Sequence, residues 1–323
     1  MKKGLFYIVC LLFSVAFIPK TFNNNRFIKT KAQLGEKLFS EKILSLDSSV
    51  SCSSCHKPAF AFADTSAFSV GINGKLTKRN TPSVLNMKNR PYYFWDGRAG
   101  SLQQQALMPI ANPDEMGLPV EEAVKRLNEN AAYRTLFLKI FQQSPTKENL
   151  GFALAAFENT LETTDSKFDD WSNNLSKLSV QEEAGRQLFI GDKAKCFNCH
   201  FMEDFTDDGF KNIGLYDGKE LNDLGHYNFK KEDRNLGKFK TPGLRNVAVT
   251  APYMHNGMFK TLEEVIDYYN DPYKIVNNPI NIDPALKKPL RLTFKEKQQL
   301  IAFLKTLTDR KFVSIQLKRS PSQ

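Results

Sequence analysis

Apolar residues recur at helical spacing through the middle of the chain. The stretches 121–128, 131–141 and 148–163 each carry apolar side chains three and four positions apart, which predicts three helices. No segment alternates between apolar and polar residues for long, so few strands are expected. Pro, Gly and Asn are frequent in the remaining chain and favour loops. The pattern as a whole predicts a mainly α protein with short helices.

The N-terminus has the pattern of an export signal. Met1-Lys2-Lys3 is basic, and the stretch from Leu5 to Pro19 carries no charge. About 15 apolar residues are too few for a membrane-spanning helix, which needs about 20; retention as a membrane anchor is the alternative. We therefore assign residues 1–25 to a signal peptide or N-terminal anchor plus a linker, and expect the protein in the periplasm.

Two Cys pairs are each followed at once by histidine. The sequences are Cys52-Ser-Ser-Cys55-His56 and Cys196-Phe-Asn-Cys199-His200. This is the pattern of covalent c-type haem attachment, in which the thiols bond to the haem and the adjacent imidazole ligates the iron. Zinc and disulfides are the alternatives, but a zinc site needs four ligands in one place and the pairs are far apart in the chain. We predict two covalently bound haem c groups, with His56 and His200 as proximal ligands.

Composition and charge fit this prediction. The chain has 323 residues, of which 41% are hydrophobic and 25% charged, as is typical of a globular protein of about two domains. Its formal charge of +10 would in another chain suggest nucleic-acid binding. Here the lysines of the signal and the carboxylates of two haems reduce the excess, so no nucleic-acid partner is expected.

The residues around the two haem motifs follow the same order. Gly35 to Phe39 precedes the first motif, and the similar stretch Gly185 to Phe189 precedes the second. After the motifs, Thr81 to Asn86 and Thr241 to Asn246 both begin Thr-Pro and end in Asn. We therefore predict two cytochrome c-like haem domains related by an internal repeat, with connecting helices. Their predicted limits are 26–165 and 166–323.

Extending the repeat pairs two further segments. With Gly97 aligned to Gly257, Trp95 pairs with His255. Continuing without gaps, Ser101 and Thr261 each fall at the cap position before a predicted helix.

The two helices differ at one position of their shared face. On the second helix this face carries Leu262, Val265, Ile266 and Tyr269, so Tyr269 points toward the core, whereas Tyr268 is rotated by about 100°. The same face of the first helix carries Leu102, Gln105, Ala106 and Pro109. Proline cannot bind iron, so one haem can gain a sixth ligand from Tyr269 while the other keeps an open position.

An open iron position is where a small oxidant binds. Gln105 shares the helix face with Pro109, and Glu115 follows in the next segment. A carboxylate beside bound peroxide can move a proton from the inner to the outer oxygen and so assist cleavage of the O–O bond. The alternative for Glu115 is an acidic cap of the helix that begins near Val120.

The chain resembles the bacterial dihaem cytochrome c peroxidase and MauG superfamily from about Leu34 to Leu307. The motifs that carry the resemblance are both CxxCH sequences, Arg79-Asn80-Thr81-Pro82, Phe94 to Ala99, Glu115-Met116, Thr241 to Val247 and Pro252 to Gly257. The resemblance implies that the N-terminal haem is peroxidatic, with His56 proximal and Gln105, Pro109 and Glu115 distal, and that the C-terminal haem handles electrons. It also implies a relay role for Trp95 and an interdomain calcium ion bound by Asn80 and the carbonyls of Thr250 and Pro252.

Two departures from the conventional peroxidases shift the expectation toward MauG-type enzymes. Where those peroxidases have a displaceable histidine after the first motif, this chain has Ile72. Where they cap the second haem with methionine, this chain offers Tyr269, with Met254 and Met258 as alternative ligands. His226 is expected at the surface or against a haem propionate.

Three functions remain open from the sequence. The leading one is a peroxidase that reduces hydrogen peroxide with electrons from a small cytochrome c or copper protein. The second is a MauG-like enzyme that uses peroxide to oxidise residues of a protein substrate. The third, an electron carrier without catalysis, needs both irons six-coordinate and is disfavoured by Pro109. The sequence leaves the oligomeric state open, and a homodimer is one option.

Overall fold

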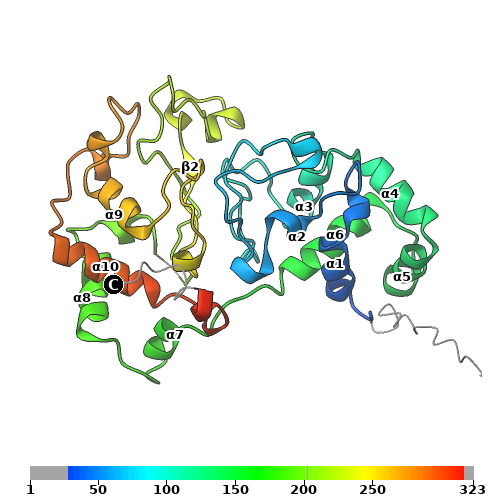
Figure 1. The fold of residues 1–323 in the computed structure, drawn as a ribbon, viewed down its shortest axis with the longest axis horizontal. Coiled ribbons are helices and arrows are strands. Elements are labelled where there is room, and N and C mark those ends of the chain that lie inside the picture. The colour runs from blue at the N-terminus through cyan, green and yellow to red at the C-terminus, as the bar shows by residue number, and fades with distance from the viewer. Residues whose placement is uncertain (1–27, 202, 316–323) are drawn as a thin grey trace, which may run out of the picture.

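The computed structural model describes residues 28–201 and 203–315, so the predicted signal or anchor lies outside the described residues. Figure 1 shows the helices α1 to α6 on one side of the molecule and α7 to α10 on the other. The N-terminal helices are α1 (Lys31–Phe39), α2 (Cys52–Cys55), α3 (Leu102–Ala111), α4 (Val120–Glu129), α5 (Ala131–Phe141) and α6 (Lys147–Glu158). The C-terminal ones are α7 (Lys167–Ser172), α8 (Val180–Ile190), α9 (Leu262–Asn270) and α10 (Phe294–Lys305).

The described chain is mainly helical, as its apolar pattern predicts. Two short strands, β1 (Phe210–Lys211) and β2 (Phe239–Lys240), form an antiparallel pair in which Phe210 lies opposite Lys240. None of the described helices combines the length and the apolar composition needed to cross a bilayer.

The three helices predicted from the central apolar pattern are present, but one is shorter than expected. The helix predicted at 148–163 ends at Glu158, where Asn159 caps it and the Thr160 backbone N–H turns back to the Phe157 carbonyl. Leu161 still packs against the core, now from a loop whose carbonyl accepts a hydrogen bond from the Asn86 backbone N–H. The apolar pattern therefore continues past the helix because the loop is also half-buried.

The N-terminal core is built on close packing of α1 against α6. Gly35 of α1 lies so near α6 that a Cβ atom there would be 1.9 Å from the Ala153 carbonyl oxygen and 2.8 Å from Phe157 Cβ. Only glycine permits this contact. Around it, Leu34, Leu38 and Leu154 are fully buried.

The C-terminal core repeats this contact between α8 and α10. A Cβ atom at Gly185 would be 1.9 Å from the Gln299 carbonyl oxygen and 2.9 Å from Phe303 Cβ. Phe303 of α10 therefore holds the place that Phe157 holds on α6. Its ring packs against Phe189 of α8, with ring centroids 5.2 Å apart.

Ion pairs join the two sides of the molecule. Arg79 donates through Nε and Nη2 to both carboxylate oxygens of Asp223 and through Nη1 to Asp96. The Asp223 carboxyl is partly buried, which by itself would raise its pKa, but the hydrogen bonds and charge of Arg79 hold that pKa below its usual value. Arg90 pairs in the same way with Asp204 and Asp208.

His226 lies inside this junction, so it is not at the surface; contact with a haem propionate, the other expected position, stays a prediction. Its side chain is buried, and Nδ1 is 2.7 Å from the Asp96 carbonyl oxygen. The imidazole stacks on the Phe210 ring of β1 at 3.8 Å. Contacts with residues distant in sequence bury this histidine, and its local sequence contains no sign of them.

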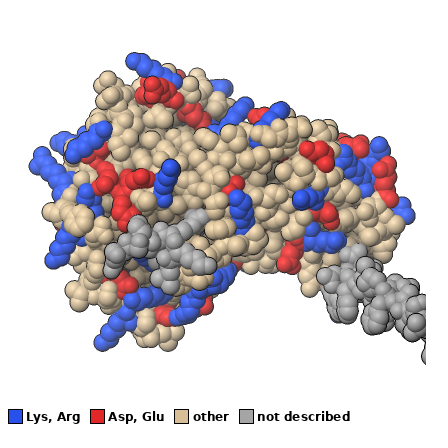
Figure 2. Space-filling view, viewed as in Figure 1, with Lys and Arg blue, Asp and Glu red and all other residues tan. Residues whose placement is uncertain are grey.

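Figure 2 shows Lys, Arg, Asp and Glu side chains interspersed on one face of the molecule. Most of the charged side chains in this view lie toward its two ends, and few lie across the middle. Neither sign forms a large continuous patch on this face.

Candidate functional site

The first haem motif forms one wall of a cavity in the N-terminal half. Cys52 begins the short helix α2, and Cys55 and His56 follow one turn later, so that all three side chains line the cavity. His56 Nδ1 is 3.2 Å from the Phe62 carbonyl oxygen. With Nδ1 as the donor to that carbonyl, Nε2 keeps the lone pair that a metal ligand needs.

Helix α3 and the segment after it form another wall of the same cavity. Gln105 and Pro109 line it from α3, and Glu115 lines it from the following segment. That segment folds back on the end of the helix, because the Met116 backbone N–H donates to the Pro109 carbonyl at 3.2 Å. The sequence prediction that these residues gather near the first haem motif fits this arrangement.

Gln105 and Glu115 bring polar groups to this cavity. The buried Oε1 atom of Gln105 has no hydrogen-bond partner among the described residues. Burial raises the pKa of Glu115, whose carboxylate accepts a hydrogen bond of 2.6 Å from Asn112 Nδ2. Glu115 does not cap α4, since the cap residue of that helix is Pro119.

Ile72 is packed away from the cavity. Its side chain is 3% exposed and lies against Gly117, and its backbone N–H donates to the Glu115 carbonyl at 2.9 Å. The loop that carries Ile72 therefore contacts the Glu115 segment on the side that faces away from the cavity.

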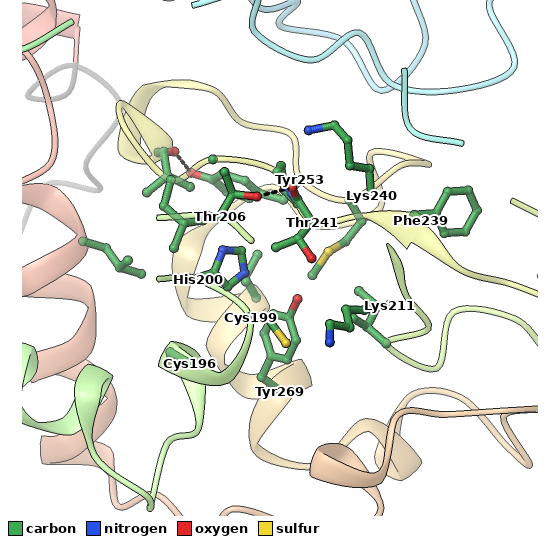
Figure 3. Close-up of a pocket in the computed structure, with 18 of the residues that line it drawn as sticks. Cys196, Cys199, His200, Thr206, Lys211, Phe239, Lys240, Thr241, Tyr253 and Tyr269 are labelled. Atoms are coloured by element: carbon green, nitrogen blue, oxygen red, sulfur yellow. Dashed lines mark hydrogen bonds between the residues drawn. The ribbon is translucent and has the colours of Figure 1, made fainter. Parts of the chain in front are cut away.

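The second haem motif lines a cavity in the C-terminal half (Figure 3). Cys196 lies in a short 3-10 helix, Cys196–Asn198, and Cys199 and His200 follow it. His200 Nδ1 is 2.8 Å from the Phe205 carbonyl oxygen, which matches the contact of His56 and again leaves Nε2 free.

Tyr269 points from α9 into this cavity beside Cys199 and His200 (Figure 3). Burial raises the pKa of its hydroxyl, so in the absence of a metal the phenol is neutral. Met254 also lines the cavity, whereas Met258 is not among its lining residues and instead packs in the cluster around Phe259. Of the three candidate haem ligands considered from the sequence, Tyr269 and Met254 therefore line the cavity of the second haem motif.

Tyr268 lies off the helix face that carries Tyr269, as the helical phase predicts, but it is not exposed, and the two rings meet edge to face with centroids 5.9 Å apart. Its side chain is fully buried and donates a hydrogen bond of 2.8 Å to the Ile213 carbonyl. Helix α9 is thus covered on two sides, with Tyr269 toward the cavity and Tyr268 toward a separate core.

The two cavities share a wall. Trp95 lines both of them, and its Nε1 donates a hydrogen bond of 2.9 Å to the Asn80 carbonyl. The Asn80 backbone N–H in turn donates to the His255 carbonyl at 2.7 Å. Asn80, Thr250 and Pro252, which the resemblance implies as calcium ligands, all line the C-terminal cavity.

The residues present fit two covalently bound haems. The four thiols of the two motifs are free, so none is consumed in a disulfide. Each pair shares its cavity with a histidine whose Nδ1 contacts a backbone carbonyl, an orientation that fixes the ring and leaves Nε2 for iron. Apolar side chains such as Leu154 and Leu300 line the remaining walls.

Comparison with known proteins identifies the family. The family profile described as di-haem cytochrome c peroxidase matches residues 29–177. The methylamine utilization protein MauG of Methylorubrum extorquens is 37% identical over 291 residues, which cover 88% of this chain and 79% of that protein. The chain belongs to the dihaem cytochrome c peroxidase and MauG superfamily.

Other members are similar in sequence and in fold. The cytochrome c peroxidase Ccp of Escherichia coli is 38% identical over 245 residues, 73% of this chain and 52% of that protein. A MauG-like protein associated with microbial copper homeostasis superposes with a TM-score of 0.79 at 33% identity, over 87% of this chain and 92% of that one. The diheme peroxidase BthA from Burkholderia thailandensis superposes with a TM-score of 0.78 at 26% identity, over 88% of this chain and 87% of that one. Membership of the superfamily implies two haem cofactors and peroxide as a substrate.

Sequence reasoning missed one residue of the N-terminal cavity. Glu158, the last residue of α6, is 4% exposed and lines the same cavity as His56. The sequence could have pointed to it, because Glu158 is a charged residue directly after a run of uncharged, mostly apolar residues in that helix. Helical spacing alone did not show that this end of α6 faces the cavity.

Proposed function

We propose that this protein is a peroxidase that reduces hydrogen peroxide to water with electrons from a small cytochrome c or copper protein. The observation that carries the proposal is the group of Gln105, Pro109 and Glu115 in the cavity of His56. Pro109 has no atom that can occupy an iron position, and the two polar side chains beside it can bind a small oxidant.

The haem, when bound, supplies the iron at which peroxide takes up two electrons. Glu115 would accept a proton from one peroxide oxygen and pass it to the other, so that this second oxygen could leave as water. Asn112 holds the carboxylate for this transfer through the hydrogen bond to Oε1. Gln105 Oε1, unpaired in the described chain, accepts a hydrogen bond from peroxide or from water. The overall reaction consumes two electrons and two protons per peroxide and yields two waters.

The C-terminal half is proposed to deliver the electrons. His200 and Tyr269 would hold the iron of its haem, and Trp95 in the shared wall would relay electrons between the haems. We infer further that the two halves are copies of one haem domain, 26–165 and 166–323. The matched glycine contacts of Gly35 and Gly185 support this.

A calcium ion at Asn80, Thr250 and Pro252 is part of the proposal. Amide and backbone carbonyl oxygens are suitable calcium ligands, although three fall short of the usual six to eight and water must supply the rest. In the described chain no group of three or more His, Cys, Asp and Glu side chains is arranged to hold a metal ion. We also propose a periplasmic location, on the basis of the N-terminal signal pattern.

A MauG-like activity, the oxidation of residues in a protein substrate, is the second candidate. The observation in its favour is Tyr269 in the C-terminal cavity, because a phenolate ligand stabilises oxidised iron whereas methionine raises the potential. Oxidising equivalents held at that haem would then be available to a protein bound nearby.

Steady-state peroxide turnover with a reduced cytochrome c or copper protein tests the two candidates. We expect turnover, and we expect Glu115→Gln to lower kcat/KM by about a hundredfold or more, because it removes the proton carrier. Glu121→Gln, on the exposed side of α4, is the matched control and should match the native enzyme. Absence of turnover with both donors, combined with peroxide-dependent oxidation of a protein, would favour the MauG-like activity.

A further inference from the structure

Helix α6 ends in a buried carboxyl group that the proposed reaction does not use. Glu158 is 4% exposed and lines the N-terminal cavity together with Cys52, Tyr93 and Leu154. Its Oε2 atom is buried and has no hydrogen-bond partner among the described residues. It also forms no ion pair with any cation in that part of the chain. A buried carboxyl without a partner is costly unless it is neutral.

The other half of the molecule has a leucine at the matching position. Gly35 contacts Phe157 of α6 as Gly185 contacts Phe303 of α10, so these two phenylalanines are equivalent. Glu158 therefore corresponds to Leu304. One turn earlier, Leu154 corresponds to Leu300. Leu154 and Glu158 line the N-terminal cavity, and Leu300 and Leu304 line the C-terminal one. Glu158 therefore introduces an ionisable group where the equivalent wall is hydrocarbon.

No cation of the described residues pairs with Glu158 or shifts its pKa, although Lys78, Arg79 and Arg98 line the same cavity. The Glu158 charge acts on the Cys52 thiol, whose pKa is raised first by burial and then by Glu158, and on the Tyr93 hydroxyl. Cys52 has no proton once it is bonded to haem, and Tyr93 donates its own to the Met87 carbonyl. Other titratable groups of opposite walls are the carboxyls of Asp96, Asp114, Glu115 and Asp223 and the imidazole of His56, which all line this cavity. Burial alone raises the pKa of Glu158 to about 8.

We propose that Glu158 binds a proton when the N-terminal haem is reduced and releases it when that haem is oxidised. An electron added to the cavity brings one negative charge, which raises the affinity of a nearby carboxylate for a proton in a poorly solvated site. One proton from solvent then neutralises Glu158 for each electron that reaches the haem, and oxidation returns it. The inference depends on the proposed function only in that haem occupies this cavity.

The proposal gives a definite pH dependence for the reduction potential. In acid, Glu158 is neutral in both oxidation states and the potential does not depend on it. As pH rises through the interval between its two pKa values, reduction requires a proton, so the potential of the N-terminal haem falls. The limit is about 59 mV for each tenfold fall in proton concentration, the value for one proton per electron.

The test is a series of redox titrations of the holoenzyme from about pH 5 to about pH 10, a range that includes the shifted carboxyl. The two haems are followed separately by their EPR and optical signals in the native protein, Glu158→Gln and Glu158→Leu. The leucine variant copies the C-terminal half and keeps the cavity filled if the glutamine variant folds poorly. Glu162→Gln, at an exposed position one turn beyond, is the matched control.

We expect the native and Glu158→Gln potentials of the N-terminal haem to converge in acid and to separate as pH rises, with the native value lower. The C-terminal potential and the Glu162→Gln control should not change. Infrared difference spectra on reduction should contain a protonated carboxyl band that both Glu158 variants lose. A constant difference at all pH values, or an unchanged carboxyl band, would overturn the proposal. Failure of peroxide turnover would bear on the proposed function and leave these measurements unaffected.

Discussion

Single side chains distinguish the two cavities. Pro109 and Tyr269 lie eight residues after the caps Ser101 and Thr261, so they hold corresponding positions on α3 and α9. Each lines the cavity of its own half. The same helical position therefore presents a phenol to the cavity of one half and a pyrrolidine ring to the cavity of the other.

Replacing Tyr269 by phenylalanine should change only the C-terminal haem. The substitution keeps the ring and its packing but removes the oxygen that can bind iron. We expect an altered spectrum and potential for that haem, while the N-terminal haem still binds small ligands. Optical and EPR spectra of the purified variant provide the measurement. A native spectrum would direct the search for the ligand to Met254, which lines the same cavity.

The resting N-terminal haem should be five-coordinate or bound only to water. Pro109 cannot ligate iron, and Ile72 is packed against Gly117 outside the cavity. Ferric EPR should therefore contain a high-spin signal without prior reduction, and peroxide should react with the oxidised protein. A purely low-spin spectrum typical of two histidine ligands would contradict this expectation.

How far the sequence predicts single residues depends on the range of the contacts involved. Local spacing and helical phase predicted that Tyr269 faces inward and that Glu115 lies near Gln105. They could not predict the burial of His226, whose partner Asp96 is 130 positions away in the chain. The place of Glu158 in the cavity wall was missed for the same reason, since only the packing of α1 on α6 shows which way the end of that helix faces.

At the scale of elements, each half depends on one helix pair in close contact. Gly35→Ala or Gly185→Ala would put a methyl carbon 1.9 Å from a carbonyl oxygen of the opposing helix, so the pair must separate. We expect a loss of about 1 to 3 kcal/mol of stability. The midpoint of thermal unfolding should fall by about 2 to 4 °C for each kcal/mol lost.

Gly100→Ala is the control for these variants, because a Cβ atom there has nothing within 4 Å. Its unfolding midpoint should stay at the native value. If Gly185→Ala were as stable as Gly100→Ala, close contact between α8 and α10 would not be what requires glycine.

Helix ends were harder to predict than helices. The apolar pattern predicted α4 and α5 closely, because each has a single buried face and a polar one. It extended α6 to residue 163, because Leu161 is half-buried in a loop and so continues the apolar spacing. The spacing of apolar residues indicates which side chains are buried. It does not indicate where the backbone turns, and α6 ends because the backbone turns at Asn159.

At the scale of the whole molecule, each of the two haem motifs lines a cavity of its own. Mass spectrometry of the mature protein should give a mass increase of two haems. Replacing Cys196 and Cys199 together by alanine should remove only the C-terminal one, because Cys52 and Cys55 line a different cavity. A native protein with one haem, or a double variant with none, would contradict this organisation.

The shared junction has a consequence for the order in which the molecule is made. Asn222, Asp223 and Asn228 belong to the C-terminal half but line the N-terminal cavity, and Arg79 is held by Asp223. An N-terminal half that folds before these residues dock on it would lack one wall of the cavity that contains Cys52 and Cys55. We expect that open side to admit a planar cofactor until the later segment closes it.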